Sequence, residues 1–300
     1  MNKSIILPAF FKGSISDINL FVEAINIVKK FNISTVEFFY DGKEKEHVKS
    51  ILKENNLKSI YLGAITAKIN KLNLSSVDEG LRKTSVNELK KCISDGYFFG
   101  ADSVLINSGQ RPKNADELPI AYNALKKSIK ELLQYTEEIQ KNYIMTITLE
   151  PGDINIDYRE LIGGTDLAIK LVQDIQKEYL NFGLTLDLSH LKQLNEKPIE
   201  SIEKAFNYCH HIHFANCIIK NKTSYLYGDK HPEFGIDDGE ISYKDLINFY
   251  EKIINTYQDN ELTIGIEIIC REDDKKKFFK KTFSNLHWFF VKSSVKPGTQ

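Results

Sequence analysis

Apolar and polar positions along this 300-residue chain switch repeatedly between two periods. Short runs of apolar and β-branched residues, often alternating with polar ones, are typical of strands, whereas apolar residues three or four positions apart are typical of helices. The expected strands are Ser4–Ala9, Thr35–Phe39, Lys58–Gly63, Ser103–Asn107, Tyr143–Glu150, Phe182–Asp187, His211–Ala215 and Leu262–Glu267. The expected helices are Ile18–Phe31, Glu44–Asn55, Val77–Phe99, Ala115–Lys141, Thr165–Tyr179, Pro198–Tyr208, Tyr243–Tyr257 and Asp273–Val291.

This alternation of strands and helices predicts an α/β protein built as a single (β/α)8 TIM barrel. A doubly wound sheet is the structural alternative, but it normally carries a glycine-rich phosphate turn after its first strand. Here the first strand runs into Pro8-Ala9-Phe10-Phe11, and the chain contains no GxGxxG sequence. No shift of composition divides the chain, so we expect one barrel domain over residues 1–294 and a short tail over 295–300.

The pattern within the strands predicts which side chains face the barrel interior. One face of Tyr143–Glu150 carries threonines and the closing glutamate, whereas the other face is apolar, because side chains two positions apart share a face. Phe182–Asp187 and Leu262–Glu267 divide in the same manner. In each strand the ionisable residue comes last on the polar face, which would place it at the carboxyl-terminal mouth, where barrel active sites lie.

Ionisable residues lie at or near the ends of four successive strands: Glu150, Asp187, His213 and Glu267. Carboxylates and imidazoles are the ligands that divalent metals prefer, so the pattern predicts a metal site. Taken singly, Glu150 could be an exposed loop carboxylate and Asp187 could cap a helix. His213 is a better ligand candidate than His211, because His211 comes at the start of its strand and can be a core histidine.

Further residues are candidates for binding a substrate. His190 follows Asp187 by about one helical turn, so both can reach the same mouth. Glu37 lies near the end of the second strand, where it could contact the substrate or orient a metal ligand. Asp229 and His231 belong to the long segment 228–239, which could bind a substrate or a second metal, or could be a glycine- and aspartate-rich surface turn.

Composition narrows the classes of partner. The formal net charge is −1 and only four basic residues are arginine, which argues against a nucleic-acid binder. No apolar stretch is long enough to span a membrane, and no secretory leader is recognisable. The four cysteines show no paired spacing. We therefore expect a reduced, cytoplasmic protein with inert cysteines.

The set Leu149-Glu150-Pro151, Leu186–His190, His211-Ile212-His213 and Ile266-Glu267 resembles the xylose isomerase-like TIM-barrel superfamily. The branch of ketose 3-epimerases and inosose dehydratase-like proteins is the most similar. The resemblance implies one divalent ion, Mn²⁺, Co²⁺, Mg²⁺ or Zn²⁺, on the four strand-end residues.

The resemblance also implies a role for each group in the site. Glu150 and Glu267 would be the catalytic acid and base, and His190 would bind a substrate oxygen. The expected activity is isomerisation or epimerisation of a small sugar, sugar phosphate or polyol, by proton transfer through a metal-stabilised enediolate. Members of this superfamily often form homodimers.

Departures from the ketose 3-epimerase pattern keep a dehydratase open. That branch usually carries a glutamate six residues after the first metal glutamate and an arginine six residues after the metal histidine. Here these positions hold Ile156 and Ile219. An inosose-type dehydratase could use the same site, because the same groups can expel a β-hydroxyl.

A hydrolase is the other alternative. Asp229, His231 and the strand-end residues are also similar to those of endonuclease IV-like enzymes, in which they would hold extra zinc for phosphodiester hydrolysis. The histidines which that family carries after its third and fourth strands are missing, since these strands end in Tyr61-Leu62-Gly63 and Ile106-Asn107-Ser108. This alternative therefore comes second.

Overall fold

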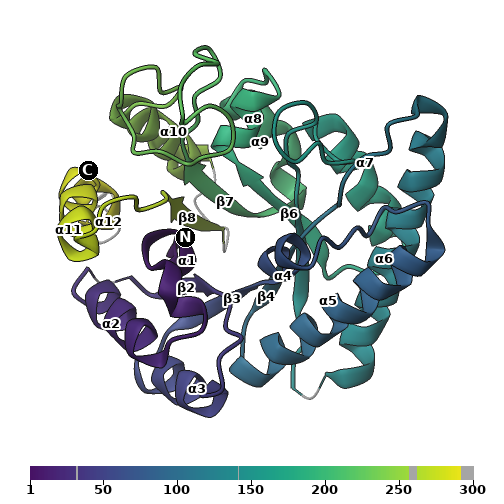
Figure 1. The fold of residues 1–300 in the computed structure, drawn as a ribbon, viewed down its shortest axis with the longest axis horizontal. Helices are drawn as coiled ribbons and strands as arrows, with labels where there is room; N and C mark the ends of the chain where they lie inside the picture. The colour runs from purple at the N-terminus through teal and green to yellow at the C-terminus, as the bar shows by residue number, and fades with distance from the viewer. Residues whose placement is uncertain (32, 141, 257–261, 292–300) are drawn as a thin grey trace, which may run out of the picture.

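The computed structural model describes residues 1–31, 33–140, 142–256 and 262–291. Eight parallel strands form one closed barrel in the order β1 to β8, and each strand pairs with its neighbours in sequence (Figure 1). The predicted (β/α)8 barrel is thus confirmed. The strands are β1 Asn2–Ile6, β2 Thr35–Phe38, β3 Lys58–Leu62, β4 Ser103–Asn107, β5 Thr146–Glu150, β6 Phe182–Asp187, β7 Cys209–Ala215 and β8 Thr263–Glu267.

Helices surround the strands, as Figure 1 shows. Side-chain caps fix several helix starts: Asp17 accepts hydrogen bonds from the backbone at the start of the helix Ile18–Lys29, and Asp78 does so at the start of the helix Glu79–Phe99. The longer helices are α2 Ile18–Lys29, α3 Lys45–Glu54, α5 Glu79–Phe99, α6 Leu118–Ile139, α7 Thr165–Gln176, α9 Pro198–Ala205, α10 Tyr243–Thr256 and α11 Lys275–Asn285. No helix in the described part of the chain is long and apolar enough to cross a bilayer.

Short helices follow three strands at the mouth of the barrel, and the sequence pattern did not predict them. They are α1 Leu7–Phe10, α4 Gly63–Ile69 and α8 Leu188–Gln193. The expected first strand was therefore too long, because Pro8 lies in the first turn of α1, where its fixed φ favours a helix. Three one-turn 3₁₀ helices complete the connections: η1 Lys12–Ile15, η2 Ala115–Glu117 and η3 Phe206–Tyr208.

The C-terminal helical stretch differs from the expected single helix. It is divided into α11 and α12 His287–Val291, because the backbone at Leu286 leaves helical angles (φ −100°, ψ 12°). Residue 257 of the expected helix Tyr243–Tyr257 and the expected domain end at 294 with its tail lie outside the described residues. Those boundaries remain predictions.

The two faces of the barrel strands differ as the alternation predicted. On the inner face, the Thr185 hydroxyl donates to the Thr148 hydroxyl at 2.9 Å, so both side chains point into the barrel. On the outer face, Ile147 and Leu184 are completely buried against the surrounding helices. Apolar packing therefore lies mainly between the strands and the helices, and polar side chains occupy much of the barrel interior.

Candidate active site

The carboxyl ends of β5 to β8 bring the four predicted ligands together. One ligand atom from each of Glu150, Asp187, His213 and Glu267 lies within 4.8 Å of the others. Strand register produces this grouping, since Asp187 pairs with His213 across β6 and β7, and Glu267 ends the adjacent strand β8. We call this group the strand-end cluster.

His213 occupies the centre of the strand-end cluster. Its Nδ1 lies 3.0 Å from a Glu150 oxygen, 3.0 Å from a Glu267 oxygen and 3.9 Å from Asp187 Oδ2. Burial alone would lower the pKa of His213, but the carboxylates beside it, Glu37 and Glu150 foremost, raise this pKa well above its usual value. So many carboxylates around one nitrogen need a positive charge among them.

Asp187 uses its two carboxylate oxygens differently. Oδ1 accepts hydrogen bonds from the backbone N–H of Ser189 (2.6 Å) and His190 (3.1 Å), which caps α8. Oδ2 is buried and accepts no hydrogen bond within the described structure. A buried carboxylate oxygen without a hydrogen bond is costly unless a cation lies beside it. The donor set of three carboxylates and one imidazole therefore fits Mn²⁺, Co²⁺, Mg²⁺ or Zn²⁺.

Glu37 lies beneath the strand-end cluster inside the barrel and does not line the cavity described below. Its oxygens lie 2.9 Å from His213 Nε2 and 3.0 Å from His211 Nε2, and the Ser4 hydroxyl donates to it at 2.6 Å. Burial would raise the pKa of Glu37, but the two histidines hold it far below the usual range. This placement fits the expected role of orienting a ligand better than contact with substrate.

Gly265 on β8 makes room for the buried Glu37. A Cβ at this position would lie 2.3 Å from Glu37 Oε1 and 2.8 Å from the Ser4 hydroxyl oxygen. Any larger residue would therefore displace the carboxylate that contacts His213.

A second polar group consists of His190, Asp229 and His231. His190 Nε2 lies 3.1 Å, and His231 Nε2 2.8 Å, from Asp229 Oδ1. His190 Nδ1 lies 3.0 Å from the Pro151 carbonyl oxygen. Asp229 and His231 are both buried, so this part of the segment 228–239 is folded into the mouth and is not a surface turn. Their ligand atoms also lie within 4.8 Å of one another.

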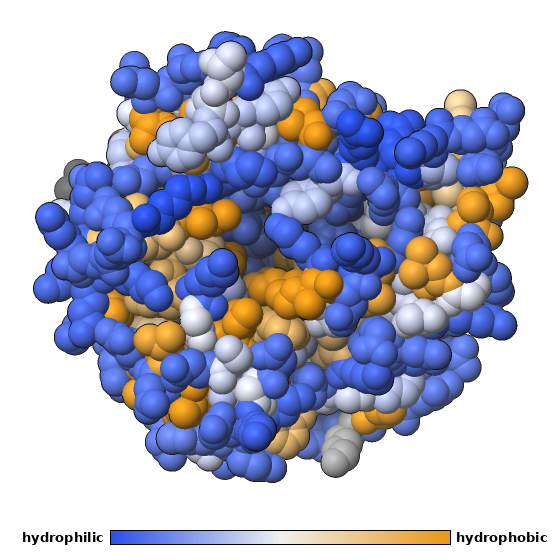
Figure 2. Space-filling model, in the orientation of Figure 1, coloured by the Kyte–Doolittle hydropathy of each residue, from blue (hydrophilic) through white to orange (hydrophobic). Residues whose placement is uncertain are grey.

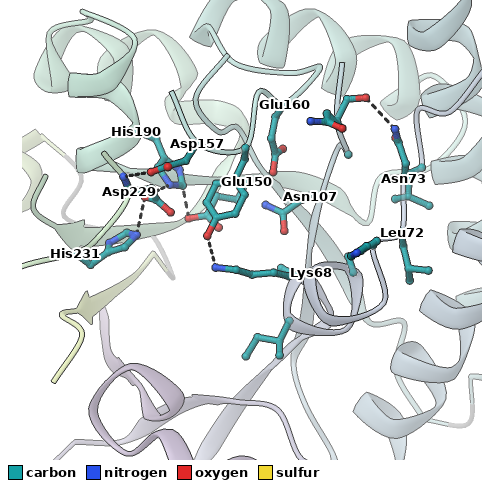
Figure 3. A pocket seen from close by; sticks show the side chains of 18 of the residues that line it. Lys68, Leu72, Asn73, Asn107, Glu150, Asp157, Glu160, His190, Asp229 and His231 are labelled. Atoms are coloured by element: carbon teal, nitrogen blue, oxygen red, sulfur yellow. Dashed lines mark hydrogen bonds and ion pairs between the residues drawn. The ribbon is translucent and has the colours of Figure 1, made fainter. Parts of the chain in front are cut away.

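Both groups open into one cavity of about 510 Å³ at the barrel mouth. Glu150, Glu267, His190, Asp229 and His231 form one end of its wall. Figure 2 shows this face of the molecule hollowed at its centre, with apolar side chains beside the hollow. Figure 3 shows Glu150, His190, Asp229 and His231 on one side of the cavity, and Lys68 and Leu72 of the segment at α4 on the other. The volume is in the range of small-molecule sites.

Glu160 lines the same cavity, and the sequence pattern did not single it out. The hydroxyl (2.9 Å) and backbone N–H (3.2 Å) of Ser108 donate to its Oε2. Burial raises the pKa of Glu160 to about 8. The sequence gives little indication of Glu160 because this residue follows Glu150 by ten positions and lies in an irregular loop. That loop folds back where the Asp153 carboxylate accepts hydrogen bonds from backbone N–H groups such as Tyr158 (2.8 Å).

A sequence model of the xylose isomerase-like TIM barrel matches residues 25–253, so the chain belongs to this family. No curated protein sequence matches the chain. Solved structures share the fold at low identity.

One is a D-tagatose 3-epimerase-like protein (18% identity, 96% of this chain and 98% of that chain, TM-score 0.68). Another is an AP endonuclease, family 2, from Brucella melitensis (15% identity, 96% and 97%, TM-score 0.69). A third is a probable 3-DHS dehydratase from Bacillus anthracis (15% identity, 96% and 99%, TM-score 0.63).

Proposed function

We propose that this protein is a divalent-metal-dependent isomerase or epimerase of a small sugar or polyol. The observation that carries the proposal is the relation between Glu150 and Glu267. They come from different strands, both line the cavity, and an oxygen of each lies 3.0 Å from the same nitrogen of His213. Two carboxylates that line one cavity can act as a general base that removes a proton from a carbon and as a general acid that returns a proton to another position or face.

Glu150, Asp187, His213 and Glu267 would hold the ion. When bound there, a divalent ion would polarise a substrate carbonyl and acidify the adjacent C–H group. Asp187 Oδ2 supports this assignment because it is buried and accepts no hydrogen bond within the described structure. Glu37 would keep His213 in place from below through its contact with Nε2.

The protein's own groups would carry the proton. One of Glu150 and Glu267 would take the proton from the carbon beside the carbonyl, and the other would supply a proton to the new position or the opposite face. His190, held between the Pro151 carbonyl and Asp229, would bind a substrate oxygen. Glu160, with its raised pKa, would be protonated at neutral pH and could donate a hydrogen bond to a hydroxyl.

Metal analysis combined with a panel of ketoses, polyols and inososes tests this function. The wild-type protein should retain one divalent ion per chain and convert at least one member of the panel, whereas Glu267→Gln should lose most of the activity. Glu272→Gln, an exposed change on the loop after β8, is the matched control. A wild-type protein that holds no metal and converts nothing would refute the proposal.

Two related activities are separated by the same measurements. A dehydratase would use the same carboxylates but release water. Its product would therefore weigh about 18 mass units less than the substrate, which is the mass of one water molecule. A phosphodiester hydrolase is favoured only by the grouping of His190, Asp229 and His231, which offers three further ligand atoms. One ion per chain supports the isomerase, and two or more support the hydrolase.

A further inference from the structure

The cavity extends well beyond the groups that would perform proton transfer. Its far wall comes from α4 and the residues that follow it, including Ala64, Ile65, Lys68 and Leu72. Lys68 and Leu72 lie on the opposite side of the cavity from His231 in Figure 3, where Lys68 reaches across toward the side of Glu150. A substrate that filled the cavity would therefore touch the strand-end cluster at one end and α4 at the other.

The acidic residues that line the cavity have partners of their own. Asp229 contacts His190 and His231, and Glu150 and Glu267 both contact His213. Asp157 accepts hydrogen bonds from the Asp229 backbone N–H (2.6 Å) and the Lys230 ammonium (3.4 Å). Glu160 accepts from Ser108, and its pKa is raised to about 8 by burial. These carboxylates are therefore partly balanced by groups other than the lysines of the α4 wall.

Lys68 has no acidic partner among the described residues, and its ammonium lies 4.7 Å from the centroid of the Tyr158 ring. Its ammonium donates a hydrogen bond to the Tyr158 hydroxyl, which belongs to the loop after β5. Among the described residues, neither Lys68 nor its neighbour in the wall, Lys71, forms an ion pair. A lysine in the last turn of a helix commonly stabilises the helix end. Lys68 instead contacts a residue ninety positions away, on the other side of the cavity.

Tyr158 adds a second donor beside this ammonium. Burial, and then the negative charges of Asp229 and Asp157, raise the pKa of Tyr158 far above its usual value, so the phenol keeps its proton. Its oxygen accepts from Lys68, and no acceptor for its own proton lies within hydrogen-bonding distance among the described residues. One phenolic O–H and the remaining ammonium N–H groups are therefore available to a ligand in the cavity.

We propose that the substrate carries an anionic substituent, a phosphate or a carboxylate, which Lys68 and Tyr158 bind at the α4 end of the cavity. This proposal rests on the proposed function, because it assigns the end of the substrate distant from the reacting carbonyl. Two charge-assisted donors that converge from α4 and the β5 loop are the chemistry that recognises an oxyanion. Ala64 and Ile65 would pack on the carbon chain between the two ends.

The kinetic test compares each ketose of the panel with its terminal phosphate ester and its terminal carboxylate. In the wild type, kcat/KM for one of the two anionic forms should exceed that of the neutral sugar by about tenfold or more. The ratio of kcat/KM for the anionic sugar to kcat/KM for the neutral sugar should fall to near one in Lys68→Met. It should be reduced less in Tyr158→Phe and in Lys68→Arg. Lys222→Met, an exposed lysine of the loop after β7, removes the same charge and should keep the ratio. Equal kcat/KM for neutral and anionic forms in the wild type would overturn the proposal.

A binding test separates this proposal from the proposed function. Inorganic phosphate is titrated by calorimetry into metal-loaded wild type, Lys68→Met and Lys222→Met. Phosphate should bind the wild type and Lys222→Met alike, and Lys68→Met about tenfold or more weakly. Identical affinity in all three proteins, or no binding to any, would refute the role of Lys68. If no sugar is converted, the proposed function fails, and the phosphate titration still decides whether Lys68 binds anions.

Discussion

Nε2 of His213 lies 2.9 Å from a carboxylate oxygen of Glu37, which is itself completely buried. With this nitrogen donating its proton to Glu37, the other ring nitrogen, Nδ1, faces Glu150 and Glu267. A carboxylate that binds the far nitrogen of an imidazole fixes both the tautomer and the ring orientation. We therefore predict that Glu37 positions His213 in the proposed metal site.

Glu37→Gln should weaken metal binding by about 10–100-fold while the barrel remains folded. The amide keeps the shape of the side chain but removes the negative charge that favours the Nε2 proton. Metal affinity can be measured by competition with a chelating dye, and folding by circular dichroism. Glu46→Gln, an exposed change on α3, is the control. An unchanged affinity in Glu37→Gln would show that the contact does not position His213.

Gly265→Ala should destabilise the protein by about 1–3 kcal/mol, the usual cost of overpacking a core. The new methyl group would meet Glu37 Oε1 at 2.3 Å and the Ser4 hydroxyl at 2.8 Å. Denaturation by urea gives the free energy of unfolding. Gly80→Ala, in the exposed first turn of α5, would meet only the Asp78 carboxylate, at 3.1 Å, and should change this free energy much less. Equal stability of both variants would mean that the barrel interior can expand at β8.

Asp187 can be separated into its two roles by a pair of variants. Asp187→Asn keeps an acceptor for the N–H groups of Ser189 and His190, so α8 should remain capped, but the loss of charge should abolish metal retention. Asp187→Ala should lose the cap as well and be less stable than Asp187→Asn by about 1 kcal/mol. Metal content and urea denaturation of the purified variants check both statements. Full metal retention by Asp187→Asn would remove Asp187 from the ligand set.

The stability of the metal-free protein should decrease as pH rises from about 4.5 through 8. Burial raises the pKa of Glu160 from 4.5 to about 8, so in this interval the folded protein binds a proton that the unfolded chain releases. The stabilisation is complete below the unfolded pKa and is lost as pH passes the folded pKa. Urea denaturation at a series of pH values should show a weaker dependence in Glu160→Gln. An identical pH dependence in both proteins would contradict the raised pKa.

The barrel and the strand-end cluster could be predicted because both depend on short-range periodicity. Phe182–Asp187 was predicted with its observed bounds. The alternation of apolar and polar residues shows which side chains face the barrel interior, and the end of the strand shows which of them lie at the mouth. The cavity wall formed by Lys68 and Tyr158 could not be predicted in this way. Lys68 lies in the short helix α4 and Tyr158 in the irregular loop after β5, ninety positions away, and nothing local in the sequence indicates that they come together. Glu160 was missed for the same reason, because its position depends on how the loop around Asp153 folds back.

The polar interior and the apolar outer layer give this barrel two sets of residues that can be changed separately. Ile147 and Leu184 contribute mainly to cohesion between strands and helices, whereas Thr148 and Thr185 on the opposite faces of the same strands lie toward the strand-end cluster. An engineer could therefore raise thermal tolerance through outward-facing positions and helix surfaces without moving the strand-end cluster. Selection for a new substrate could act on α4 and the loops with little penalty in folding.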